Sequence, residues 1–305
     1  MAGKLTEEDE KSYFTDLING ITEAIITAFN NTGEVELMTG IGQAPGISFN
    51  RRYLMTDGRV RFNPGRNNPK IVSPAGPVDP DVNFILFKPK NQNNYSASLT
   101  VFASHYVRGG TEFSSDYPYF MQLRFNELLG DQHLSVFGLG ACGNVNTTDP
   151  FGPVKNEDQK VKEFGYILAD AVNSKIPAAN KDFPSLEIIT KTMYIPIQDY
   201  TEEELAWSRE EGREQLYNER SFINHRRRLK ISVWGVQPPL EKLRMYEAVA
   251  PAVSGEPWRI PVEIHVFKLS SNTAIVTMPG ELFTEFGIDL KKRSPFANTM
   301  LIELA

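Results

Sequence analysis

The sequence predicts an α/β protein in which a mixed β-sheet is flanked by helices, in a single domain. Its 305 residues are 41% hydrophobic and 23% charged, which is typical of a globular chain with enough apolar material for one sizeable core. Short apolar runs of strand length alternate with longer runs whose apolar residues recur at helical spacing. The order strand, helix, strand over residues 98–139 indicates a mixed or parallel sheet, in which loops at the strand ends would carry any chemistry.

The charge balance and the residue counts exclude several classes of function. There are 32 Lys and Arg against 38 Asp and Glu, a net charge of −6, so we expect no nucleic-acid partner. The single cysteine, Cys142, excludes an intramolecular disulfide and a cysteine-based zinc or iron–sulfur site. Four histidines still allow a metal site built from histidine and carboxylate. The sequence contains no run of 18 consecutive apolar residues, so it predicts no transmembrane helix. The polar start MAGKLTEEDEK lacks the apolar region of a signal peptide.

The first third of the chain predicts a helix, a strand and a long excursion. Apolar residues at helical spacing run from Leu17 to Phe29 behind a possible Thr6 cap, and a strand is expected over Glu34–Gly40. Residues 41–81 are rich in Pro, Gly and Asn, with a Thr-Asp-Gly turn between short β-prone runs. A loop of this length is more often functional or interface-forming than idle, so we expect a functional loop here.

The middle of the chain predicts the strand–helix–strand unit. Asn83–Lys88 and Ser98–Ala103 are apolar strand candidates, Tyr117–Leu129 has a helical pattern, and Leu134–Leu139 is predicted as a buried strand. A helix is expected over residues 157–174 and a strand over Leu186–Ile197.

The last third predicts a charged helical excursion, a hairpin and a final helix. Residues 201–230 are expected to be helical, and their Arg226–Arg228 triplet is either a solvated helix end or an anion-binding patch. Pro261–Leu269 and Ala274–Met278 predict a hairpin. Pro279-Gly280-Glu281 is then expected to open a helix reaching about Lys292, and the chain ends in a strand-like segment, residues 298–305.

Two glycine-containing segments at strand ends are candidates for chemistry. His105 follows an apolar strand and precedes paired glycines; its imidazole would bind a metal or transfer protons, or it would simply hydrogen-bond a loop carbonyl. Residues 138–149, GLGACGNVNTTD, would expose backbone amides and Asn side chains to an oxyanion, or form only a tight turn. This segment lacks both the Gly-Lys-Ser/Thr ending of a P-loop and a Gly-x-Ser-x-Gly elbow.

A carboxylate and an arginine complete the candidate set. Glu281 is expected in the first turn of the last helix, sharing a face with Glu285, as a partner of the helix dipole or as a metal ligand or general base. Arg51 lies in the 41–81 loop, where it would bind a carboxylate, a phosphate or a polar headgroup, or pair with Asp57.

Taken in order, these motifs resemble the neutral/alkaline non-lysosomal ceramidase N-terminal domain family, most closely its uncharacterised bacterial branch. The resemblance runs from about Glu34 to the last residue. It is carried by FNRR, NPG and PAGPVDP, then SHYVRGGTEFSSDYP and GACGNVNTTD, and finally MPGELFTEFG and KKRSPF.

The resemblance implies a zinc-dependent amidase that cleaves an N-acyl bond, in ceramides for the characterised members. In that family two histidines, a glutamate and a tyrosine hold the zinc. His105 is similar to the second histidine and Glu281 to the glutamate. Arg51, Asp116 and Gly143 would lie on the substrate side, while Asn144 and Asn146 occupy the loop that carries the family's catalytic serine.

The departures from the family pattern concern the zinc site. No histidine precedes His105, where the family has a His-x-His motif, and the zinc tyrosine is expected beyond Ala305. Asn146 stands at the serine position. The resemblance thus implies a partial domain, truncated at both ends, whose zinc site is completed by another segment or by an oligomeric partner. Expected substrates are small-molecule or lipid amides, and a longer parent would be secreted or periplasmic. The alternative is an inactive ceramidase-like scaffold that serves as a binding module.

Overall fold

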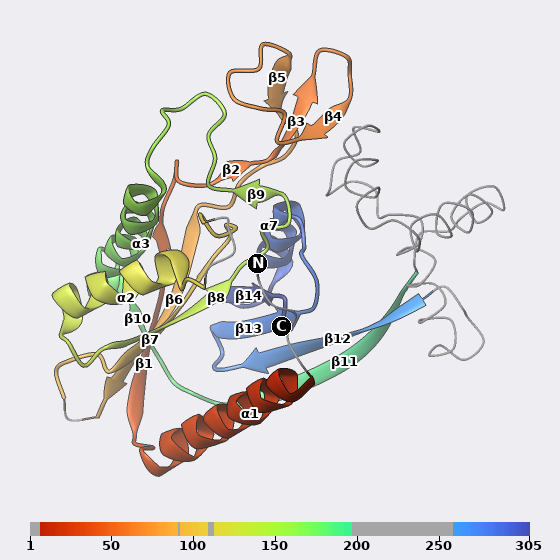
Figure 1. The fold of residues 1–305 in the computed structure, drawn as a ribbon. Helices are drawn as coiled ribbons and strands as arrows, with labels where there is room; N and C mark the ends of the chain where they lie inside the picture. Colours follow the sequence, from red (N-terminus) through yellow and green to blue (C-terminus); the bar gives the residue numbers. More distant parts are fainter. Residues whose placement is uncertain (1–6, 91, 109–112, 197–258) are drawn as a thin grey trace.

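The protein forms an α/β sandwich in which two mixed sheets pack face to face and helices cover their outer faces (Figure 1). The computed structural model describes residues 7–90, 92–108, 113–196 and 259–305. The predicted fold class is therefore confirmed, although the expected single sheet is divided into two main sheets and two small ones.

The first main sheet has five strands in the order β10-β1-β6-β7-β8. They are β1 (Val35–Gln43), β6 (Asp81–Pro89), β7 (Ala97–Phe102), β8 (Leu134–Leu139) and β10 (Asn180–Asp182). β7 and β8 are parallel, and every other neighbouring pair is antiparallel. The parallel pair is connected by α2 (Asp116–Leu129), the crossover that the sequence pattern predicts.

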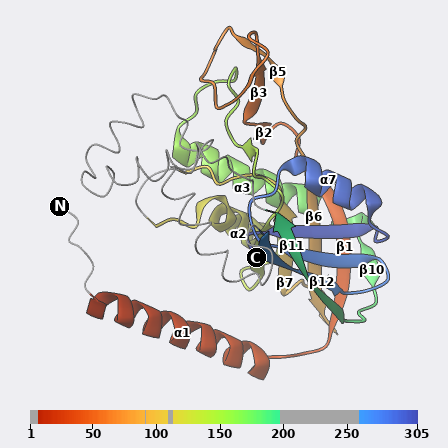
Figure 2. The ribbon, with the colours of Figure 1, turned by 90° about the vertical axis from the view of Figure 1, so that its right-hand side faces the viewer.

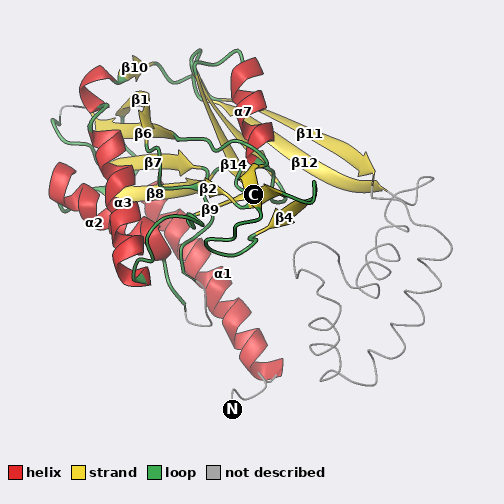
Figure 3. Cartoon of the chain, turned by 90° about the horizontal axis from the view of Figure 1, so that it is seen from above, coloured by secondary structure: helices red, strands yellow, loops and turns green. Residues whose placement is uncertain are grey.

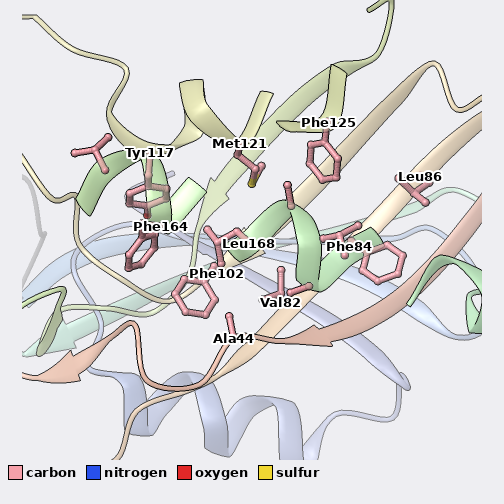
Figure 4. Close-up of a cluster of buried hydrophobic side chains, with 14 residues drawn as sticks. Ala44, Val82, Phe84, Leu86, Phe102, Tyr117, Met121, Phe125, Phe164 and Leu168 are labelled. Atoms are coloured by element: carbon pink, nitrogen blue, oxygen red, sulfur yellow. The ribbon is translucent and has the colours of Figure 1, made fainter. Parts of the chain in front are cut away.

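Helices α2 and α3 (Glu157–Asn173) cover one face of this sheet and enclose the largest core of the protein (Figures 3 and 4). Phe84 and Leu86 of β6 point to the helices, whereas Ile85 points to the opposite face, as strand geometry requires. The helices approach closely at Gly165, where a Cβ atom would lie 2.5 Å from the Tyr117 carbonyl oxygen. This contact fixes α2, and with it the loop that follows β7.

The second main sheet has four strands in the order β11-β12-β13-β14. They are β11 (Glu187–Pro196), β12 (Arg259–Lys268), β13 (Thr273–Met278) and β14 (Asn298–Glu303). Only β13 and β14 are parallel, and helix α7 (Thr284–Arg293) connects them.

A second apolar cluster joins the two sheets. Ile85 and Val101 of the first sheet pack with Met300 and Ile275 of the second. On the other face of the second sheet, Leu301 packs in a cluster with Leu290 of α7. The order of layers is thus helices, sheet, sheet, helix.

The predicted 41–81 loop is shorter than expected, because residues 41–43 extend β1 and Asp81 begins β6; the residues between them form small β-structures above the main sheets (Figure 1). β2 (Phe49–Asn50) pairs with β9 (Val145–Asn146), while β3 (Arg52–Met55), β4 (Val60–Phe62) and β5 (Ile71–Pro74) form a three-stranded sheet. The predicted Thr56-Asp57-Gly58 turn lies between β3 and β4, with Gly58 at φ +75°.

The first helix, α1 (Glu7–Asn30), projects away from the sandwich (Figure 2). Its apolar residues are exposed, including Phe29 at 75%. No helix in the described ranges is both long and apolar enough to cross a membrane. A short 3-10 turn at Ile176–Ala178 follows α3. The predicted 201–230 helix, with its arginine triplet, and the Thr6 cap lie outside the described residues.

Candidate functional site

The site lies where the two parallel strand pairs end side by side. His105 follows the end of β7 and Cys142 follows the end of β8, because parallel strands finish at the same edge of a sheet. In the second sheet β13 and β14 also end together, with Met278 opposite Glu303. Two sheet edges therefore meet and carry polar side chains from four segments, the position at which α/β folds commonly bind ligands.

A continuous line of polar contacts crosses this junction. The Nδ1 atom of His105 lies 3.2 Å from the Cys142 sulfur, and the Cys142 thiol donates to the Glu303 Oε1 atom at 3.1 Å. On the opposite side of the imidazole ring, Nε2 lies 3.9 Å from the Oε2 atom of Glu281. Cys142 is fully buried and Glu303 is 2% exposed, whereas the Glu281 side chain is 43% exposed. The line runs from the interior to solvent.

Arg51 approaches the same carboxylate from the 41–81 segment. Its Nε and Nη2 atoms donate to the Gly143 carbonyl oxygen at 3.2 and 2.6 Å, and Nη2 lies 3.9 Å from Glu281 Oε2. Asp57, the local partner that the sequence offered, pairs with Arg61 at 2.6 Å. The structure therefore brings together His105, Glu281, Arg51 and Gly143, four of the residues predicted for the site.

The position of Glu281 differs from the prediction. The last helix begins at Thr284, because Gly280 adopts φ +87° and turns the chain before a helix can start. Glu281 thus lies in the turn after β13 and does not share a helix face with Glu285. Its backbone is held against Gly143, whose N–H donates to the Leu282 carbonyl at 2.7 Å.

Asn144 is buried and its side chain is fully engaged. The Oδ1 atom accepts from the Thr284 N–H at 2.8 Å, and the Nδ2 atom donates to Glu285 Oε2 at 2.7 Å. An oxygen that accepts from the first N–H of a helix acts as a cap, so Asn144 holds the start of α7. Glu285 is directed toward Asn144, whereas Glu281 faces His105 and Arg51.

Asn146 lines one of two neighbouring cavities. Its Nδ2 atom donates to Asn63 Oδ1 at 3.0 Å, and its Oδ1 atom accepts from the Thr148 N–H at 2.9 Å. Asn146 lines a cavity of about 230 Å³, and a neighbouring cavity of about 450 Å³ shares Arg66 and Thr148 as lining residues. The larger cavity has a mixed lining: apolar side chains such as Ile47, Phe49 and Phe164 stand beside charged ones such as Arg66, Lys155 and Lys160.

Asp116 organises the loop after β7. Its carboxylate accepts hydrogen bonds from the N–H groups of Val107, Arg108 and Tyr117, at 3.1, 2.8 and 2.7 Å. It is 5% exposed and adopts φ +52° at the start of α2. In this arrangement its carboxylate binds the backbone that follows His105.

The surroundings of the site residues shift their pKa values. Burial lowers the pKa of His105, and the nearby Arg51 guanidinium lowers it further, while Glu281 acts in the opposite direction. Burial raises the pKa of Glu303 to about 7 and raises that of the Cys142 thiol well above its ordinary value. Burial also lowers the pKa of Arg51, which stays protonated because guanidinium groups do not lose their proton in proteins. The uncharged imidazole and thiol are thus favoured at neutral pH.

His105 and Glu281 are of the residue types that bind zinc, and they are two of the groups that such a site would need. Imidazole nitrogen and carboxylate oxygen are both zinc ligands, and His105 Nε2 and Glu281 Oε2 face each other. Within the described part of the chain, no group of three or more His, Cys, Asp or Glu side chains could hold a metal ion. A catalytic zinc needs three protein ligands, so a third would come from outside these residues.

The other histidines have different surroundings. His133 is buried between Ser98 Oγ and the Tyr95 carbonyl, at 3.0 and 2.9 Å. His265 contacts Thr190 on the second sheet. His225 lies outside the described residues.

Sequence reasoning missed Cys142 and Glu303 as parts of the site. In the sequence, Cys142 served only to exclude a disulfide and a cysteine-based metal site. Glu303 is the one charged residue in the otherwise uncharged strand Asn298–Glu303, and a charge at the end of a buried strand is the signal by which it could have been found.

Comparisons with known proteins identify solved structures with a similar fold. No protein-family model matches the sequence, and a search of curated proteins found no match. Among solved structures, the chain is similar to neutral ceramidase from Pseudomonas aeruginosa, with a TM-score of 0.58 and 16% identity over 95% of this chain and 48% of that one. It is also similar to a ceramidase complexed with C2, with a TM-score of 0.54 and 14% identity over 89% of this chain and 47% of that one. The chain spans about half the length of these structures, and it has a ceramidase-like fold.

Proposed function

We propose that this chain carries part of the active site of a ceramidase-like hydrolase that cleaves an N-acyl amide bond. The observation that supports the proposal is the meeting of His105, Glu281 and Arg51 at the ends of the two parallel strand pairs, on a fold that resembles neutral ceramidase. These residues come from distant parts of the sequence, and each belongs to a motif that carried the resemblance.

His105 and Glu281 would hold zinc, with further ligands from outside the described residues. Bound zinc would polarise the amide carbonyl and lower the pKa of its water. The side chains of His105 and Glu281 provide the atoms that would bind the metal. The neutral imidazole of His105 offers a lone pair at Nε2, and the half-exposed carboxylate of Glu281 offers an oxygen that faces the same space.

Arg51 contributes a fixed positive charge. Its guanidinium is 7% exposed and is anchored on the Gly143 carbonyl, so it cannot move freely to solvent. A buried cation next to Glu281 favours negative charge in this part of the site and would help to orient a substrate carbonyl or hydroxyl.

The cavities beside Asn146 would receive the substrate. The smaller one is lined by Asn63 and Asn146 together with Tyr53 and two prolines, and the larger one combines apolar side chains such as Phe164 with charged ones such as Lys160. A lipid amide, which has a polar and an apolar part, would find both kinds of lining in the larger cavity.

The alternative function is a ceramidase-like binding module without catalysis. The side chains of Asn144 and Asn146, at the family's serine loop, are engaged in hydrogen bonds within the protein. Such a module would bind an N-acyl amide and leave it intact.

One experiment distinguishes the two functions. The purified chain is incubated with a short-chain N-acylsphingosine, with and without added Zn²⁺, and the released amine is quantified by a fluorogenic amine reagent. We expect zinc-dependent release that falls at least about a hundredfold in Glu281→Gln and His105→Gln. His265→Gln, which alters a histidine of the second sheet away from these contacts, serves as the control. Binding of the substrate without release, or equal rates in all variants, would favour the binding module.

A further inference from the structure

The carboxylate of Glu303 reaches toward both candidate ligands without contacting either. Its Oε2 atom accepts from the Leu282 N–H at 2.8 Å, and Leu282 directly follows Glu281. Its Oε1 atom accepts from the Cys142 thiol at 3.1 Å, and Cys142 contacts the His105 ring. Burial to 2% exposure leaves Glu303 little access to water, so these two donors and the backbone N–H of Cys142 are its principal partners.

The chemistry of the three groups fixes where each proton lies. When Glu303 is ionised its carboxylate only accepts hydrogen bonds, so the Cys142 S–H then points to Glu303, as in the 3.1 Å contact. The sulfur lone pairs then face His105 Nδ1 at 3.2 Å and accept from it, which requires the imidazole proton to be on Nδ1. The unprotonated nitrogen is consequently Nε2, the atom that faces Glu281 at 3.9 Å.

We propose that Glu303 is a positioning residue that holds His105 in the Nδ1–H tautomer through Cys142 and holds the Glu281 turn through the Leu282 N–H. The imidazole tautomer is set by the hydrogen bond that its other nitrogen makes, and partners behind a ligand histidine commonly set its orientation. Here the Glu303 carboxylate acts indirectly, because the Cys142 thiol lies between it and the His105 ring. The importance of this positioning role for catalysis rests on the proposed function. The tautomer of His105 itself can be measured without any hydrolysis.

A competing explanation comes from the backbone. Hydrogen bonds from the His105 side chain to the backbone of Cys142 and Val145 also contribute to its environment. Backbone carbonyls could fix the same tautomer without the thiol or Glu303. Substitutions that alter only the two side chains separate these explanations.

The measurement is a long-range ¹H–¹⁵N correlation spectrum of the histidine rings in the metal-free chain at pH 8.5. At this pH Glu303, whose pKa burial raises to about 7, is ionised. His133 gives an internal reference for the Nδ1–H tautomer, because its Nδ1 atom faces the Tyr95 carbonyl. His265 gives the opposite reference, because its Nε2 atom lies 3.1 Å from a Glu263 oxygen.

Three variants complete the design. Cys142→Ser keeps a donor and an acceptor between Glu303 and His105, so the Nδ1–H tautomer should persist. Cys142→Ala removes the acceptor, and the ratio of the two tautomers should fall about fivefold, the change that a hydrogen bond of about 1 kcal/mol produces. In Glu303→Gln the amide oxygen is retained by the Leu282 N–H, the NH₂ group faces the sulfur, and the S–H turns to Nδ1. We therefore expect the tautomer to reverse to Nε2–H.

Several outcomes would overturn the proposal. An Nε2–H tautomer of His105 in the unaltered chain does so without any variant, even if the substituted chains fail to fold. A tautomer ratio in Cys142→Ala equal to that of the unaltered chain would assign the role to the backbone carbonyls. An unchanged spectrum in folded Glu303→Gln would remove Glu303 from the relay. None of these results depends on hydrolysis, so they are distinguishable from failure of the proposed function.

Discussion

Replacing Gly143 by alanine should disturb the turn that carries Glu281. An added Cβ atom would lie 2.6 Å from the Glu281 carbonyl oxygen and 3.0 Å from that of Leu282. Both are backbone atoms, so no side-chain rotation relieves the overlap. Ordinary contact begins at 3.4 Å, which requires a separation of 3.4 − 2.6 = 0.8 Å. The same movement would stretch the 2.7 Å hydrogen bond from the Gly143 N–H to Leu282 to about 3.5 Å.

The expected cost follows from these two effects. Overpacking costs about 1–3 kcal/mol and the lost hydrogen bond about 1 kcal/mol, so Gly143→Ala should destabilise the protein by about 2–4 kcal/mol. For a chain of 305 residues that corresponds to a fall in Tm of about 3–6 °C, measured by far-UV circular dichroism. Gly33→Ala is the matched control, because no atom lies within 4 Å of the added Cβ and its φ is ordinary. If both variants melt within about 2 °C of each other, the close contact of Gly143 with the backbone of Glu281 and Leu282 would be refuted.

Three further predictions concern the supports of the site. Asp116→Ala removes the acceptor of three backbone N–H groups and should lower the free energy of unfolding by about 2–3 kcal/mol in urea titrations, whereas Asp116→Asn should recover part of it. Tyr117→Phe deletes the buried hydrogen bond from the hydroxyl to the Ser104 carbonyl, 2.9 Å long, and should cost about 1–2 kcal/mol by the same assay. Burial lowers the pKa of His133, so its contribution to stability is complete above the unfolded-state value near 6.5 and is lost as the pH falls below it. His133→Gln should therefore flatten the decline of stability between about pH 7 and pH 5; an equally steep decline would contradict this assignment.

The strands and helices could be predicted because their periodicity is local. Leu134–Leu139 has the bounds that the apolar run predicts, and the expected helices at 117–129 and 157–174 agree with α2 and α3 to within one residue at each end. The division into two sheets was not predictable, because it depends on which strands pair at a distance. Ile85 and Met300, which join the sheets, are ordinary apolar residues in the sequence.

The candidate site was predictable only in part, for physical reasons. His105 and Arg51 stand in recognisable motifs, and the fold brings them to one junction. The place of Glu281 depended on the left-handed conformation of Gly280, which the sequence permits without requiring. The thiol and carboxylate behind His105 are 161 residues apart, and no local pattern connects them.

That separation makes Cys142 a natural chemical reporter of the folded state. A contact between residues so distant in the chain forms only after a long loop has closed, so it should appear late in folding. Cys142 is the only cysteine of the chain and is fully buried. Under native conditions a thiol-specific reagent can reach it only when the junction of the sheets opens, so the labelling rate measures the free energy of that opening. The labelling kinetics of this one thiol would thus report when the junction between the two sheets forms and how often it opens.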